Sequence, residues 1–216
     1  MEPTDLHPVL CAEEIRVLGS LIEKSKTTPD YYPMTVNGLT AACNQKTSRK
    51  PIMQIDESTV LGTLEMLRKK GLVSTATGGA SRSVKYKHNL AIVFPLDPPQ
   101  VTVLCLLMLR GPQTPGELNT NAGRMYEFDS LEEVQKVLES LADMIPPFVL
   151  QLPRKTGQKE LRYTHLLSGI PETNPEEDEM IFTGPSSDTE SRIQRLEDEV
   201  RELKEVVDKL LKELGV

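Results

Sequence analysis

Apolar residues recur every three or four positions in three stretches of the first ninety residues, which predicts three amphipathic helices. Thr35 and Asp56 stand where the N-caps of the second and third helices belong, and Gly71 ends the third. Alternating polar and apolar residues on either side of a Gly-Gly turn then predict two strands. The expected elements are helices over 12–24, 36–44 and 57–70, and strands over 72–75 and 83–87.

The same order of elements is predicted a second time, about 85 residues further on, although the two copies share little sequence. Asp97 and Pro98 begin a helix with almost no polar face, and Thr114 and Ser130 each open a capping box. The third helix should bury a stripe of four residues. Its members are Leu131, Val134, Leu138 and Leu141, and strands over 148–152 and 160–165 follow.

Three helices followed by a two-stranded hairpin are the plan of a winged helix, in which the hairpin is the wing. The sequence therefore predicts a mainly α protein with small β-hairpins, in the α+β class, built from two tandem winged-helix domains over residues 6–90 and 97–168. Residues 169–190 are acidic and interrupted by prolines, which predicts a flexible linker.

The last segment, residues 191–215, has the strictest pattern in the chain. Apolar residues follow steps of three and four without interruption, with β-branched residues at a and Leu at d, which favours a parallel two-stranded coiled coil. A trimer, and an amphipathic helix that folds back on its own domain, remain alternatives. The predicted oligomerisation residues are Ile193, Leu196, Val200, Leu203, Val207, Leu210 and Leu214.

The net charge of −7 conceals an uneven distribution along the chain. Residues 6–90 carry 12 Lys and Arg against 7 Asp and Glu, whereas residues 169–216 carry 6 against 14. No apolar run is long enough to span a membrane, and no signal peptide is recognisable at the N-terminus. Cys11, Cys43 and Cys105 have no metal-ligand spacing, so we expect reduced, buried thiols and a cytoplasmic protein.

The basic residues of the first domain make double-stranded DNA the leading candidate partner. They gather in the connection before the third helix and on the wing, where a phosphate backbone would pass. Ser58 and Thr59 begin the third helix, but Glu57 beside them would repel phosphate. The alternative is a solvated basic surface. The candidate nucleic-acid-binding residues are Lys46, Thr47, Ser48, Arg49, Lys50, Ser58, Thr59, Arg82, Lys85 and Lys87.

No motif for catalysis, a metal or a cofactor is present, so we expect a protein that is not an enzyme and has no cofactor. The three histidines have no neighbouring carboxylate or Cys arrangement typical of a catalytic triad or metal site. Gly78-Gly79-Ala80-Ser81 lacks the spacing of a phosphate-binding loop. Because the third helix of the second domain exposes mostly acidic residues, that domain is expected either to hold the architecture together or to contact a protein partner.

Two segments resemble the YceH-like family of uncharacterised bacterial proteins. The first runs from Arg16 through Glu23 and Lys24 to Asn44-Gln45-Lys46 and Arg49, and the second is Arg110-Gly111-Pro112-Gln113-Thr114-Pro115-Gly116-Glu117-Leu118. The resemblance implies two winged helices and leaves the activity open. It also suggests a polar cluster between the first two helices.

Two hypotheses follow from these patterns. The first is a dimeric DNA-binding or DNA-associated regulator, which self-associates through the C-terminal coil. The alternative is a protein-interaction scaffold, similar in outline to the tandem winged-helix subunits of chromosome-condensing complexes, which also tend to be acidic.

Overall fold

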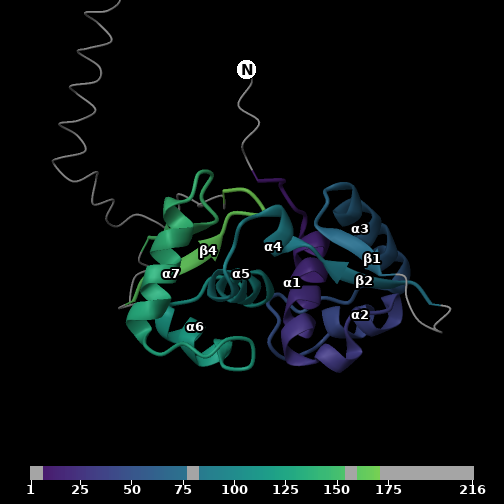
Figure 1. Cartoon of the computed structure of the whole chain (residues 1–216), viewed down its shortest axis with the longest axis horizontal. Coiled ribbons are helices and arrows are strands. Elements are labelled where there is room, and N and C mark those ends of the chain that lie inside the picture. Colours follow the sequence, from purple (N-terminus) through teal and green to yellow (C-terminus); the bar gives the residue numbers. More distant parts are fainter. Residues whose placement is uncertain (1–6, 77–82, 154–159, 171–216) are drawn as a thin grey trace, which may run out of the picture. The chain divides into compact units, whose positions relative to one another are not determined.

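The structure is a computed structural model, and it describes residues 7–76, 83–153 and 160–170. The described residues belong to one compact unit of α-helices and small antiparallel strand pairs. The predicted coil, with Ile193, Leu196, Val200, Leu203, Val207, Leu210 and Leu214, lies outside the described residues, as does the linker from residue 171 onward. Figure 1 shows the elements in space. We call the elements within residues 12–88 the first module and those within residues 98–165 the second module.

The first module contains three helices followed by a hairpin, as the sequence predicts. Thr35 Oγ1 accepts a hydrogen bond from the Gly38 amide, and Asp56 accepts one from the Thr59 amide, so both predicted N-caps are confirmed. A short 3-10 turn, η1, occupies part of the expected loop after the first helix. The elements are α1 (Ala12–Thr27), η1 (Pro29–Tyr31), α2 (Val36–Cys43), α3 (Glu57–Lys69), β1 (Val73–Ala76) and β2 (Lys85–His88).

The second module repeats this order. Thr114 and Glu117 form the predicted capping box. Ser130 accepts a hydrogen bond from the Glu133 amide, but the Glu133 carboxylate accepts from the Asp129 amide, so the second half of the capping box predicted at Ser130 is not formed. A four-residue helix, α4 (Leu90–Val93), joins the modules and was not predicted. The remaining elements are α5 (Pro98–Arg110), α6 (Pro115–Ala122), α7 (Leu131–Asp143), β3 (Val149–Leu152) and β4 (Arg162–His165).

The two hairpins are built alike down to single residues. β1 pairs with β2 and β3 with β4, both antiparallel. In each module the residue before the N-cap of the second helix forms a bridge to the middle of the returning strand, Met34 to Tyr86 and Gln113 to Tyr163. The repetition of this bridge supports the duplication inferred from the sequence.

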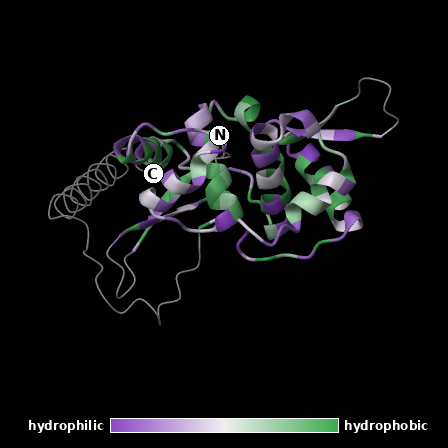
Figure 2. Ribbon diagram, turned by 90° about the horizontal axis from the view of Figure 1, so that it is seen from below, coloured by the Kyte–Doolittle hydropathy of each residue, from purple (hydrophilic) through white to green (hydrophobic). Residues whose placement is uncertain are grey.

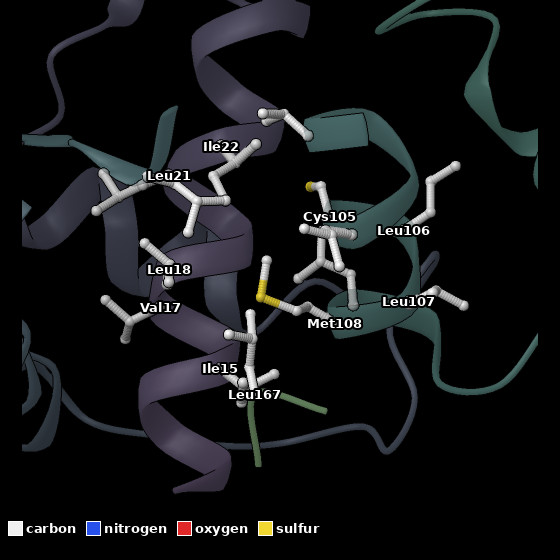
Figure 3. Packing of buried hydrophobic residues seen from close by; sticks show 14 of the residues in the cluster. Ile15, Val17, Leu18, Leu21, Ile22, Cys105, Leu106, Leu107, Met108 and Leu167 are labelled. Atoms are coloured by element: carbon white, nitrogen blue, oxygen red, sulfur yellow. The ribbon is translucent and has the colours of Figure 1, made fainter. Parts of the chain in front are cut away.

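The modules meet where α1 packs against α5, and the side chains between them are almost all apolar (Figure 3). Gly19 allows the close approach, because a Cβ at this position would lie 2.9 Å from Leu109 Cδ2 and 3.4 Å from Met108 Cβ. Cys105 Sγ lies 3.3 Å from the Gly19 carbonyl oxygen. One continuous core therefore joins the two halves. Figure 2 shows hydrophobic and hydrophilic residues alternating around most helices, as expected for amphipathic helices that share a core.

Two expectations about burial are wrong. Leu131 was expected in the core but is 41% exposed, because it occupies the first turn of α7, where the helix extends beyond the core. Cys11 was expected to be a buried thiol but is exposed, since it is the N-cap residue of α1. Cys43 and Cys105 are buried as expected.

Candidate nucleic-acid interface

Arg49 does not face solvent, which corrects its assignment as a phosphate-binding residue. Its side chain is fully buried and donates two hydrogen bonds to the Glu23 carboxylate, at 2.7 and 3.1 Å. It also donates to the carbonyl oxygen of Ala42. Burial alone would raise the pKa of Glu23, but hydrogen bonds and charge from Arg49 outweigh it and lower that pKa. Arg49 therefore holds the loop against α1 and α2.

The rest of the 46–50 loop is held against the second module. The Lys50 amide donates to the carbonyl oxygen of Leu109 at 2.8 Å. Arg110 Nη2 donates to Ser48 Oγ at 2.9 Å, and Ser48 has the left-handed φ of 61°. Arg110 Nη1 donates to Asn121 on α6. The candidate residue Ser48 is thus engaged in the contact between modules, and the side chains of Lys46, Thr47 and Lys50 remain exposed.

The wing presents two more cations of the candidate set, of which Lys87 is exposed and Lys85 is half-buried. Lys85 and Lys87 alternate with the buried Tyr86, so both point away from the core. Neither they nor Lys46 and Lys50 form an ion pair with a carboxylate among the described residues. Arg82 lies outside the described residues.

The wing and the loop do not converge on one point. The wing joins the chain at Met34, just before α2, whereas the 46–50 loop follows the last residue of α2, Cys43. Eight helical residues separate them, a distance of about 12 Å along the helix axis. Lys85 and Lys87 therefore lie near the start of α2, whereas Lys46 and Lys50 lie on the loop that follows its end.

The start of α3 is accessible but acidic. Ser58 and Thr59 are exposed, and Ser58 Oγ donates to the carboxylate of Asp56 at 2.8 Å. Glu57 accepts a hydrogen bond from Asn37 Nδ2 at 2.8 Å, which brings the first turns of α2 and α3 together. Two exposed carboxylates, Asp56 and Glu57, thus flank the end of the helix that would face DNA bases.

A polar cluster does lie between the first two helices, as the resemblance suggests. Lys24 Nζ lies 3.2 Å from the Glu23 carboxylate and 3.5 Å from Gln45 Oε1. Asn44 exchanges two hydrogen bonds with the main chain of Ile55. Arg16 is 2% exposed and donates to the carbonyl oxygens of Cys43 and Pro51. These residues fix the connection from α2 to α3.

Sequence reasoning missed the interior role of several charged residues. Lys70 Nζ lies 2.7 Å from both oxygens of the Glu14 carboxylate. The only hint of this role in the sequence is a charged residue, Arg16, placed between the apolar residues Ile15 and Val17 of α1. Because much of the positive charge of the first module is neutralised or buried, its surface is less basic than its composition suggests.

The second module carries a pocket of about 670 Å³ next to the loop. Glu117 and Arg162 form a two-fold hydrogen-bonded ion pair there, with both distances 2.8 Å. Burial raises the pKa of Glu117, but hydrogen bonds from Arg162 and from the Thr114 amide lower it on balance. Its lining residues are Thr114, Gly116, Glu117, Thr120, Asn121, Glu160 and Arg162. This ion pair ties α6 to β4.

The histidines offer no exposed acid–base pair within the described part of the chain. His88 and His165 end β2 and β4, and burial lowers the pKa of each to about 4. Among the described residues, no three His, Cys, Asp or Glu side chains are grouped to hold a metal ion. No helix there is long and apolar enough to cross a membrane.

Comparison with known proteins places the chain in a family. Residues 10–158 match the family described as "Protein of unknown function, DUF480". A UPF0502 protein of Opitutus terrae is 52% identical over 163 residues, covering 75% of this chain and 71% of that protein. A UPF0502 protein of Geobacter metallireducens is 46% identical over 198 residues, covering 90% of both chains. These matches agree with the resemblance to the YceH-like family. The chain therefore belongs to the DUF480 family, among the bacterial UPF0502 proteins.

Proposed function

We propose that the protein is a non-enzymatic DNA-associated regulator with two winged-helix modules, the first of which contacts the DNA backbone. The observation that carries the proposal is two pairs of lysines on the first module, Lys85 with Lys87 on the wing and Lys46 with Lys50 on the loop after α2. None of the four forms an ion pair with a carboxylate among the described residues, although the charge of Lys50 helps to lower the pKa of Glu117. Arg49 is not part of this surface.

The expected mode is contact with phosphates rather than reading of bases. Lysines attract the phosphate backbone without regard to sequence, whereas base reading needs side chains such as Arg, Asn or Gln at the start of the recognition helix. Asp56, the N-cap of α3, and Glu57, its first residue, stand at that point and oppose close approach to DNA. We therefore expect weak sequence preference and strong dependence on salt.

Fluorescence anisotropy with a random-sequence duplex tests the proposal. If all four lysines contact phosphates, the logarithm of the binding constant should fall with the logarithm of salt concentration with a slope of about −3.6. Replacing Lys85 and Lys87 with Gln should reduce the slope by about 1.8. Lys136→Gln, an exposed position on α7, is the matched control and should leave it unchanged. Absence of binding at low salt would reject the proposal.

A second candidate is a protein-interaction scaffold, and the acidic residues favour it. Asp56 and Glu57 are exposed at the start of α3, and Glu132, Glu139 and Asp143 are exposed on α7. Such a protein would bind no DNA duplex at low salt. It would instead bind a basic protein partner through the exposed acidic residues of α7. For either function we propose self-association through residues 193–214, on the strength of their heptad pattern.

A further inference from the structure

The 46–50 loop belongs to the first module, yet its last residues are anchored on the second module. The Lys50 amide donates to the carbonyl oxygen of Leu109 at 2.8 Å, and Ser48 Oγ accepts from Arg110 Nη2 at 2.9 Å. Ser48 has a φ of 61°, a left-handed conformation that a residue with a side chain keeps only when its surroundings hold it there. The end of α5 therefore supports this part of the loop.

Arg110 is the last residue of α5, and its guanidinium bonds to two elements at once. While Nη2 donates to Ser48, Nη1 donates to Asn121 Oδ1 on α6 at 2.8 Å. Asn121 Nδ2 in turn donates to Gln113 Oε1 at 2.8 Å, and the main chain of Gln113 exchanges two hydrogen bonds with that of Tyr163 on β4. A guanidinium donates from separate nitrogens in fixed directions, which suits an arginine to orienting a loop. One hydrogen-bonded chain of residues thus leads from the loop to α6 and the second hairpin.

The first module fixes the same loop from its other side, through Arg49. This side chain is buried and donates to the Glu23 carboxylate on α1. Residues 48–50 are therefore each held by a different part of the fold, whereas the side chains of Lys46 and Lys50 stay exposed. The positions of these two lysines thus depend on contacts made by both modules.

We propose that Arg110 is a positioning residue, through which the second module holds the loop in the conformation that presents Lys46 and Lys50 to a phosphate backbone. The part of this inference that concerns DNA rests on the function proposed above. Arg110 does not itself contact DNA in this arrangement, because it is half-buried and both of its terminal nitrogens bind within the protein. A loop that is ordered before binding loses less conformational entropy on binding, so the complex is tighter.

Amide hydrogen exchange of the full chain, followed by NMR, tests the anchoring of the loop without DNA. In Arg110→Met the aliphatic stem remains but both hydrogen bonds are lost. The Lys50 amide should then exchange about 5- to 30-fold faster, the factor that corresponds to freeing one backbone residue. The Ile55 amide, which donates to Asn44 Oδ1 at the far end of the same connection, is the internal control and should not change. Equal protection of the Lys50 amide in wild type and variant would overturn the proposal.

Anisotropy with the random-sequence duplex separates positioning from direct contact. Because the lysine charges remain, Arg110→Met should lower the binding constant about 5- to 30-fold at every salt concentration and leave the salt slope unchanged. The same change should have no effect once Lys46 and Lys50 have been replaced with Gln, and an equal effect there would overturn the proposal. A slope reduced by about 0.9 would overturn it as well, because Arg110 would then neutralise a phosphate itself. Arg124→Met, at an exposed position after α6, controls for the lost charge and should change neither quantity.

A variant on the loop side decides the question if Arg110→Met does not fold. Ser48→Gly removes the acceptor but suits the left-handed φ, so it should reproduce both changes. Ser48→Asn tolerates this φ and offers a new acceptor, so the Lys50 amide should exchange slowly again, and equally fast exchange in both variants would overturn the proposal. The two possible failures are distinguishable. A wild type that binds no duplex refutes the proposed function, whereas unchanged exchange in Arg110→Met refutes the role of Arg110 alone.

Discussion

Mild acid is expected to destabilise the folded chain through His88 and His165, before most carboxylates are protonated. Burial lowers the pKa of both histidines to about 4, against an ordinary value of 6.5. Each side chain is therefore neutral when folded but takes up a proton when unfolded below pH 6.5. Their contribution to the free energy of unfolding is therefore fully present above pH 6.5 and decreases as the pH falls. It stops changing below about pH 4, where the folded state is protonated as well.

The magnitude follows from the size of the pKa difference. One unit corresponds to about 1.4 kcal/mol, so each histidine should cost about 2 kcal/mol of unfolding free energy between pH 7 and pH 5. The two together should cost about 4 kcal/mol, a large part of the stability of a typical domain. Carboxylates such as Glu23, whose pKa is lowered in the fold, act at lower pH, because their unfolded pKa is near 4.5.

Urea denaturation followed by circular dichroism at pH 7, 6 and 5 measures the effect. The double variant His88→Gln/His165→Gln removes both titrations, so its loss of unfolding free energy between pH 7 and pH 5 should be about 4 kcal/mol smaller than that of the wild type. Comparing differences in pH dependence avoids the problem that the variant has a different stability at pH 7. If both proteins lose equal free energy over this range, the reasoning is wrong. The His7→Gln variant separates any contribution from the third histidine, whose pKa burial also lowers.

Three further changes test the packing and the assembly. Gly19→Ala should cost about 1–3 kcal/mol of unfolding free energy, because the new Cβ would press on the α5 side chains. The control Gly62→Ala, with no atom within 4 Å of the new Cβ, should stabilise the fold by about 0.5–1 kcal/mol. Equal effects of the two changes in urea denaturation would refute the close approach of α1 and α5. Arg49→Ala should cost about 3–5 kcal/mol, because it removes the buried partner of Glu23, which keeps only Lys24, and the hydrogen bonds to the Ala42 carbonyl oxygen. It should not change the salt slope of DNA binding, and a flattened slope with unchanged stability would contradict the burial of Arg49. Deleting residues 191–216 should lower the mass measured by light scattering, and an unaltered mass would reject the heptads as a dimer contact.

The sequence was sufficient to predict the elements whose ends depend on neighbours along the chain. The caps at Thr35, Asp56, Thr114 and Ser130 are confirmed, because an N-cap is made by a side chain and an amide three residues away. The duplicated order of helices and strands was predictable for the same reason. It rests on periodicity within each element, which needs no knowledge of what the element packs against.

Tertiary structure alone decided which charged and apolar side chains face solvent. Arg49 belongs to a basic run in the sequence, but it is buried because its guanidinium pairs with Glu23, 26 residues away. Leu131 has the spacing of a core residue, yet it is exposed because the core ends before it. The lack of a side chain at Gly19 matters for packing only because α5 lies against α1. Burial depends on partners distant in sequence, and a pattern along one helix contains no information about them.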